Sequence, residues 1–139
     1  MKKIEHIGIA VKDLTLAIET YEKLLGISCY KIEQVESEQV TTAFFEIAGV
    51  KIELLASENP NSAISKFILK RGEGLHHIAF EVENLETETK RLKAGDIQLF
   101  NSDTKNGADH KLINFIHPSK CNGVLIELCS DSTFSDVNS

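Results

Sequence analysis

The sequence predicts an α+β fold in which two tandem βαβββ modules form a curved mixed sheet with helices on its outer face. The main evidence is an internal repeat. The segment His6-Ile-Gly-Ile-Ala-Val-Lys-Asp-Leu14 recurs about half a chain later as His77-Ile-Ala-Phe-Glu-Val-Glu-Asn-Leu85, with His, Ile, Val and Leu shared. A second repeat relates Lys51-Ile-Glu-Leu-Leu55 to Leu125-Ile-Glu-Leu-Cys129 at nearly the same offset. Two repeats at about half the length of a 139-residue chain indicate a tandem duplication.

The first module is expected over residues 1–58, approximately. Apolar residues alternate over residues 4–11, which predicts a strand with Ile7, Ile9 and Val11 on one face. Asp13 can cap a following helix of helical apolar spacing, which Gly26 ends. Three further strands are expected near 28–35, 40–47 and 50–56, with Ala48-Gly49 as a tight connection between the last two.

The second module, over about 74–130, has the same order of elements. A strand is expected at about 76–82, followed by a helix from Asn84 through Leu92 that Gly95 stops. Further strands are expected near 97–101, 111–117 and 123–130. A short linker helix, at about 61–71, separates the modules, and the tail after Ser130 is polar. We expect one single domain over residues 1–139.

Composition excludes several classes of protein. The net charge is 15 − 21 = −6, which argues against a nucleic-acid-binding protein. No apolar run approaches the ~20 residues of a membrane-spanning helix, so no membrane association is expected. The three cysteines form no C-x-x-C pair and make a poor disulfide framework, so we expect a cytoplasmic protein.

Four polar residues interrupt the predicted strands at repeated positions. His6 and His77 open equivalent strands, and Glu53 and Glu127 lie inside equivalent Ile-Glu-Leu segments. A carboxylate buried on a sheet face is costly unless it is paired or bound to a cation. Imidazole and carboxylate without thiolate suit Zn²⁺, Co²⁺, Ni²⁺, Mn²⁺ or Fe²⁺. We therefore expect a metal site if the two modules bring these side chains together.

A structural role is the alternative for each of these residues, because a single histidine or glutamate in a strand is usually exposed or satisfied locally. The match between the two halves is what favours a shared site. The remaining histidines are expected to have other roles: His76 points to the opposite face from His77, and His110 and His117 have no repeat partner.

At these residues the chain resembles the vicinal oxygen chelate superfamily (glyoxalase/bleomycin resistance/dioxygenase) and, within it, the methylmalonyl-CoA epimerases. The resemblance extends from residue 6 to 128. The more specific segments are Gly72-Glu-Gly-Leu-His-His-Ile-Ala-Phe-Glu-Val82, and His117-Pro118 followed by Gly123-Val-Leu-Ile-Glu-Leu128. The opening His-x-x-x-x-Val is shared by the whole superfamily.

The resemblance implies one divalent metal ion (Co, Zn, Ni or Mn) held by His6, Glu53, His77 and Glu127. Several epimerases carry glutamine at the position of Glu53. The implied reaction inverts the α-carbon of methylmalonyl-CoA by proton abstraction through a metal-stabilised enolate. Some epimerases have a further carboxylate at a position that is Ala43 when read without gaps, so proton transfer is assigned to Glu127. A homodimer is common in the superfamily and is expected here.

Three other functions stay open on the residues alone. Glyoxalase I has the same metal-ligand set and would act on a hemithioacetal, a glutathione adduct in place of an acyl-CoA thioester. Extradiol dioxygenases need only two histidines and one carboxylate around iron, so the fourth ligand argues against them. Metal-free, drug-sequestering relatives lack the metal residues, whereas this chain has all four.

Overall fold

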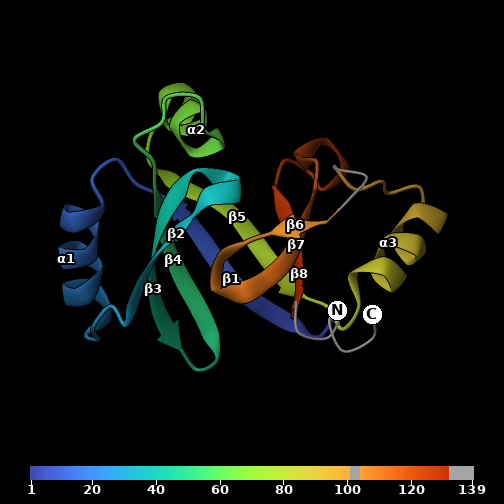
Figure 1. Cartoon of the computed structure of the whole chain (residues 1–139), viewed down its shortest axis with the longest axis horizontal. Helices are drawn as coiled ribbons and strands as arrows, with labels where there is room; N and C mark the ends of the chain where they lie inside the picture. Colours follow the sequence, from blue (N-terminus) through green and yellow to red (C-terminus); the bar gives the residue numbers. More distant parts are fainter. Residues whose placement is uncertain (101–103, 132–139) are drawn as a thin grey trace. The chain divides into compact units, whose positions relative to one another are not determined.

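The computed structural model describes residues 1–100 and 104–131 (Figure 1). Its strands are β1 (Lys3–Ala10), β2 (Lys31–Val35), β3 (Val40–Ile47), β4 (Val50–Ala56), β5 (Gly74–Glu81), β6 (Lys105–Asn106), β7 (Lys111–Ile116) and β8 (Ile126–Asp131). The helices are α1 (Leu14–Leu25), α2 (Ala63–Arg71) and α3 (Leu85–Ala94), with short 3-10 turns at Glu36–Glu38, Ala108–His110 and Pro118–Lys120.

The strands have the hydrogen-bonded order β2-β3-β4-β1-β5-β8-β7-β6. β1 is parallel to β4 and β5 is parallel to β8, whereas the remaining pairs with a described register are antiparallel. The predicted α+β class and the mixed sheet are therefore confirmed. The chain divides into two compact units, which are described separately below: His6–His76, and Met1–Glu5 together with His77–Ser139.

In the unit His6–His76, helix α1 covers one face of the strands. Asp13 caps it by accepting a hydrogen bond from the Leu16 amide, and Gly26 ends it in the left-handed region at φ 71°. The apolar side of the helix packs on β3 and β4, where Phe45 and Leu54 are fully buried. Other members of this cluster are Val11, Ala43, Ile9, Leu14, Ala17, Ile18, Tyr21, Leu25, Cys29, Ile52 and Ala56. The opposite face of these strands stays clear of α1.

In the other unit, helix α3 covers one face of the strands in the same way. Asn84 caps it by accepting a hydrogen bond from the Thr87 amide. Leu85 and Leu92 of the helix pack with Ile116 of β7 and Leu128 of β8 in one buried cluster. Side chains that alternate with these along β7 and β8 therefore point to the face that α3 does not cover.

The internal repeat is visible in the bounds of the elements. β1 and β5 begin at Lys3 and Gly74, and β3 and β7 begin at Val40 and Lys111, with the same offset in each pair. Helices α1 and α3, which begin at Leu14 and Leu85, keep that offset too. The two halves are thus built from the same sequence of elements, as the repeat predicts.

Three predicted strands differ from the structure. The strand expected at 123–130 begins only at Ile126. The strand expected at 28–35 begins only at Lys31. The strand expected at 97–101 is wrong for its described residues: Leu99 makes one isolated bridge to Ile116, and the strand that pairs with β7 is β6, farther along the chain. Residue 101 and the polar tail from residue 132 lie outside the described residues. None of the described helices has the length and apolar character that a membrane span requires.

The hairpin between β3 and β4 contains a strained alanine. Ile47 pairs with Val50, and both residues of the two-residue turn have positive φ, 50° at Ala48 and 87° at Gly49. Turns of this kind favour asparagine or glycine, because other L-residues pay a steric cost in the left-handed region. The alanine at this position therefore reduces the stability of the fold.

We expect Ala48→Asn to stabilise the protein by about 0.5–1 kcal/mol, since asparagine tolerates the left-handed conformation. Thermal and urea unfolding would measure the change. Ala94→Asn is the matched control: Ala94 is an exposed residue in the last turn of α3, where asparagine lowers helix propensity and should not stabilise. A lower melting temperature for Ala48→Asn would contradict the strain argument.

Candidate metal centre

His6 and Glu53 form a buried pair in the unit His6–His76. His6 lies on β1 and Glu53 on the neighbouring parallel strand β4. His6 Nδ1 is 3.1 Å from Glu53 Oε2, and the two residues are 5% and 3% exposed. Both side chains lie on the face that α1 does not cover, because they alternate with the residues that pack on the helix.

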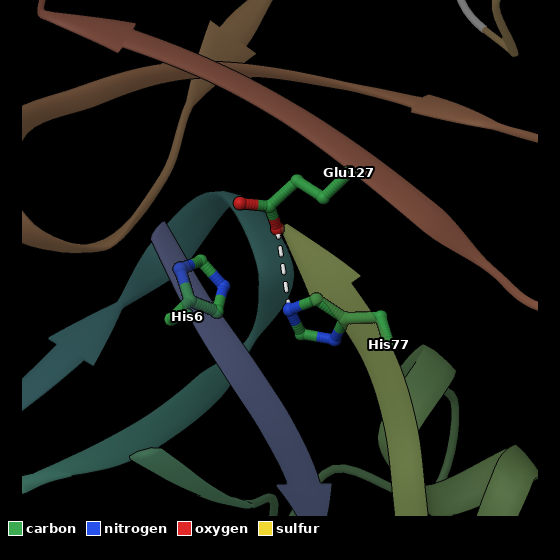
Figure 2. A group of neighbouring side chains, drawn as sticks. All are labelled: His6, His77 and Glu127. Carbon is green, nitrogen blue, oxygen red and sulfur yellow. Dashed lines mark ion pairs between the residues drawn. The ribbon is translucent and has the colours of Figure 1, made fainter. Parts of the chain in front are cut away.

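His77 and Glu127 form a second buried pair in the other unit. His77 lies on β5 and Glu127 on β8, and Figure 2 shows the two side chains pointing toward each other across the strands. His77 Nε2 is 3.4 Å from Glu127 Oε1, and each residue is 5% exposed. The ring of Phe115, on β7, meets the His77 imidazole edge-on at 6.2 Å between centroids. The Phe115 ring therefore packs beside the imidazole.

The two pairs occupy equivalent positions on their strands, although His6 meets its glutamate through Nδ1 and His77 through Nε2. Glu53 lies opposite Gly8 on one side and Phe44 on the other, and Glu127 lies opposite Ala79 and Phe115. In each unit the histidine comes two residues before the small residue that faces the glutamate. The sequence prediction that these histidines and glutamates occupy equivalent positions is therefore confirmed.

The donor atoms of each pair fit a divalent ion. Two ligand atoms that each lie about 2.1 Å from one ion, at angles between 90° and 109°, are about 3.0–3.4 Å apart. The His6–Glu53 and His77–Glu127 separations both lie within this range. Imidazole nitrogen and carboxylate oxygen are ligands of Zn²⁺ and of the neighbouring first-row ions. The carboxylates are almost completely buried, so they require either a cation or a charged partner.

The remaining histidines have other surroundings. His76 meets the Phe67 ring edge-on at 4.9 Å, and burial lowers the pKa of its imidazole to about 4, so the ring is neutral near pH 7. His110 is exposed. His117, also exposed, accepts a hydrogen bond from the Ser119 amide and stacks on Phe100. All three have the structural surroundings expected of residues outside the repeated pairs.

The cysteines are free thiols. Burial raises the pKa of the Cys129 thiol strongly, with a smaller contribution from the charge of Glu127, so the thiol remains protonated at neutral pH. Burial also raises the pKa of the Cys121 thiol.

The sequence did not predict the burial of two polar residues, and a third position lies on a different face of the sheet from the one expected for a carboxylate near Glu53. Glu5, beside His6, is 3% exposed, and nothing in the strand pattern indicates this. Thr42 is completely buried on the same face as Glu53, and its repeat partner Ile113 could have drawn attention to it. Ala43, where a further carboxylate was sought, packs in the cluster under α1, so position 43 points away from Glu53.

The comparisons with known proteins identify the family. Residues 5–115 match the family model of the Glyoxalase/Bleomycin resistance protein/Dioxygenase superfamily. The chain belongs to this superfamily. One relative in the superfamily, the uncharacterized protein YqjC of Bacillus subtilis, is 40% identical over 129 residues, which are 93% of this chain and 92% of YqjC.

Several relatives of this chain are named as epimerases. The ethylmalonyl-CoA/methylmalonyl-CoA epimerase of Cereibacter sphaeroides is 37% identical over 128 residues, covering 91% of this chain and 96% of that protein. A solved structure of methylmalonyl-CoA epimerase in complex with methylmalonyl-CoA and NH₄⁺ has a TM-score of 0.90 at 30% identity. It covers 95% of this chain and 96% of the solved chain. The protein is thus a member of the superfamily that is related to methylmalonyl-CoA epimerases.

Proposed function

We propose that this protein is a divalent-metal-dependent epimerase that inverts the α-carbon of methylmalonyl-CoA. The observation that carries the proposal is the pair of buried His–Glu contacts at equivalent strand positions, one in each half of the repeat. The full-length similarity to acyl-CoA epimerases supports the choice of substrate. His6, Glu53, His77 and Glu127 together would bind one ion.

The internal repeat supports one shared ion, because each half of the chain supplies one histidine and one glutamate at equivalent strand positions. His6, His77 and Glu127 each offer one ligand atom, and Glu53 offers a carboxylate oxygen. A set of two imidazoles and two carboxylates leaves coordination positions for a substrate at a six-coordinate ion.

The chemistry follows from the acidity of the substrate. The α-carbon of methylmalonyl-CoA lies between a thioester and a carboxylate, so its proton is weakly acidic. A divalent ion held by the four residues would supply Lewis-acid stabilisation of the negative charge that develops on the acyl oxygens. Glu127 accepts the α-proton on a carboxylate oxygen, and the buried contact with His77 keeps that carboxylate in place. Inversion then requires that a proton return to the opposite side of the carbon.

Incubation with methylmalonyl-CoA in D₂O tests the proposal. The protein would be stripped with a chelator and reloaded separately with Co²⁺, Zn²⁺, Ni²⁺ or Mn²⁺. We expect the reloaded protein to exchange the α-proton for deuterium and to interconvert the two epimers, measured by NMR and by a stereospecific coupled assay. The chelator-treated protein is the control and should do neither.

A second substrate distinguishes the proposed epimerase from the alternative function, glyoxalase I. The hemithioacetal of methylglyoxal and glutathione is the substrate of glyoxalase I, whose metal-ligand set is the same. Exchange with methylmalonyl-CoA no faster than in buffer would contradict the epimerase proposal. If the same metal-loaded sample converted the hemithioacetal, the glyoxalase function would replace it.

A further inference from the structure

Thr42 carries a buried hydroxyl without a hydrogen-bond partner among the described residues. Its side chain is completely buried in the middle of β3, and no described group forms a hydrogen bond with Oγ1. A buried donor without a partner destabilises the folded state, and native proteins rarely retain one. The position therefore requires an explanation that the fold itself does not supply.

The hydroxyl lies on the same face of the strands as Glu53. Phe44 lies directly opposite Glu53, and Thr42, two residues earlier, lies opposite Leu55. Residues opposite each other in a sheet share a face, and diagonal neighbours such as Thr42 and Glu53 are roughly 7–8 Å apart. Thr42 is therefore one row of side chains away from the candidate metal ligand, at a distance that a short acyl group can span.

Small residues of β1 lie beside this row. Gly8 and Ala10 of β1 lie opposite Glu53 and Leu55, on the same face as His6. Neither residue has a side chain long enough to reach over the neighbouring strand. For a ligand bound at Glu53 of β4, the next strand on the side away from β1 is β3, where the Thr42 hydroxyl is located on the same face.

The internal repeat provides a reference for this position. Ile113 of β7 is the repeat partner of Thr42, just as Phe115 is the repeat partner of Phe44, and Ile113 is 3% exposed. The same place in the second half is thus filled by an apolar β-branched side chain. Packing alone does not require a hydroxyl at this position. The threonine at residue 42 is therefore an asymmetry between the halves that a ligand would explain.

We propose that the Thr42 hydroxyl donates a hydrogen bond to the carboxylate of a malonyl-type acyl-CoA substrate. This inference rests on the proposed function. A charged acceptor forms a stronger hydrogen bond than a neutral thioester carbonyl does, and the difference grows where water is excluded. Thr42 therefore selects acyl groups that carry a carboxylate next to the reacting carbon.

Binding of malonyl-CoA and acetyl-CoA tests the proposal, because the two differ only in this carboxylate and neither can show a net change on epimerisation. Calorimetric titration of the metal-loaded protein would compare wild type with Thr42→Val and Thr42→Ser. We expect Thr42→Val to weaken malonyl-CoA binding about tenfold to a hundredfold and to leave acetyl-CoA binding unchanged. Thr42→Ser keeps the donor and should bind malonyl-CoA nearly as well as wild type.

The matched control is Thr41→Val, on the same strand. Thr41 lies opposite Ala56, which packs in the cluster under α1, so its side chain points to the other face. This variant should bind both thioesters as wild type does. Unliganded Thr42→Val should also melt at the wild-type temperature or above it, since it replaces an unpartnered hydroxyl with a methyl group. A markedly lower melting temperature would show that the hydroxyl bonds within the protein, which overturns the proposal.

Two other results would overturn the assignment of Thr42. One is unchanged malonyl-CoA binding by Thr42→Val, and the other is an equal loss for malonyl-CoA and acetyl-CoA. The deuterium-exchange assay on wild-type protein separates these results from a failure of the proposed function. An inactive wild type contradicts the epimerase function, whereas an active wild type with a normally binding Thr42→Val variant contradicts only the role of Thr42.

Discussion

Glu127→Gln is expected to lower the rate of α-proton exchange by about 10²–10⁴-fold, the usual contribution of a positioned base, while a substantial part of the metal remains bound. Glutamine keeps a coordinating oxygen but cannot accept a proton near neutral pH. The two side chains have nearly the same shape, so the substitution should fit the site, where the native residue is 5% exposed. The exchange rate in D₂O and the metal content of the same sample are the two measurements.

Glu53→Gln is the matched control. Glu53 is equally buried and makes the equivalent contact with a histidine, but the proposal gives it metal binding alone. This variant should retain its metal and much of its activity. If both variants lost metal and activity together and to similar degrees, both glutamates would be plain ligands. A metal-loaded Glu127→Gln protein with wild-type activity would place the base elsewhere.

His77→Ala is expected to remove the stabilisation that a divalent ion gives to the folded protein. An ion present at 100 times its dissociation constant stabilises the folded state by about 2.7 kcal/mol, provided that the unfolded chain does not bind it. The variant should show almost none of this gain, because it lacks an imidazole ligand. Urea unfolding with and without Co²⁺ or Zn²⁺, after treatment with a chelator, would measure the difference.

His6→Ala should behave as His77→Ala does if one ion is shared. His110→Asn is the control, because His110 is exposed and has φ 57°, a conformation that asparagine accommodates. It should keep the full metal-dependent gain. A His6→Ala protein that kept the wild-type gain while His77→Ala lost it would show that the two buried pairs do not bind one ion together.

The repeated elements could be predicted from the sequence because each has a strong local signal. Asp13 and Asn84 cap their helices as expected, and both accept hydrogen bonds from the amide three residues later. The equivalence of Glu53 and Glu127 also followed from the sequence, since a strand has an unambiguous alternation and the two Ile-Glu-Leu segments place each carboxylate on the face away from the helix. The local sequence pattern was therefore sufficient to predict the face on which a side chain lies, wherever the other face of the strand packs against a helix.

The features that the sequence did not reveal depend on pairing between distant strands. β6 is only two residues long and is defined by its bonds to β7, so its own pattern could not indicate it. The residue after β6 is Gly107. A Cβ atom at this position would lie only 2.7 Å from the Ile113 side chain, so a larger residue would not fit without a shift of its neighbours. Similarly, the face to which Thr42 points becomes clear only when its partner Leu55 is known. An ungapped comparison with the epimerases therefore points to Ala43, whose side chain lies on the face that α1 covers and not on the face of Glu53.

The pairing of β1 bears on the order in which the protein folds during synthesis. His6 pairs with Lys51, and the Lys2 amide donates a hydrogen bond to the carbonyl of Glu81, which lies in the second half of the chain. During synthesis β1 therefore emerges well before Glu81, whose carbonyl accepts the hydrogen bond at its second edge. Contacts of such long sequence separation slow folding, and an unpaired apolar strand can associate with other nascent chains. An N-terminal fusion partner that folds quickly and keeps this strand soluble should raise the yield of folded protein more than a C-terminal one.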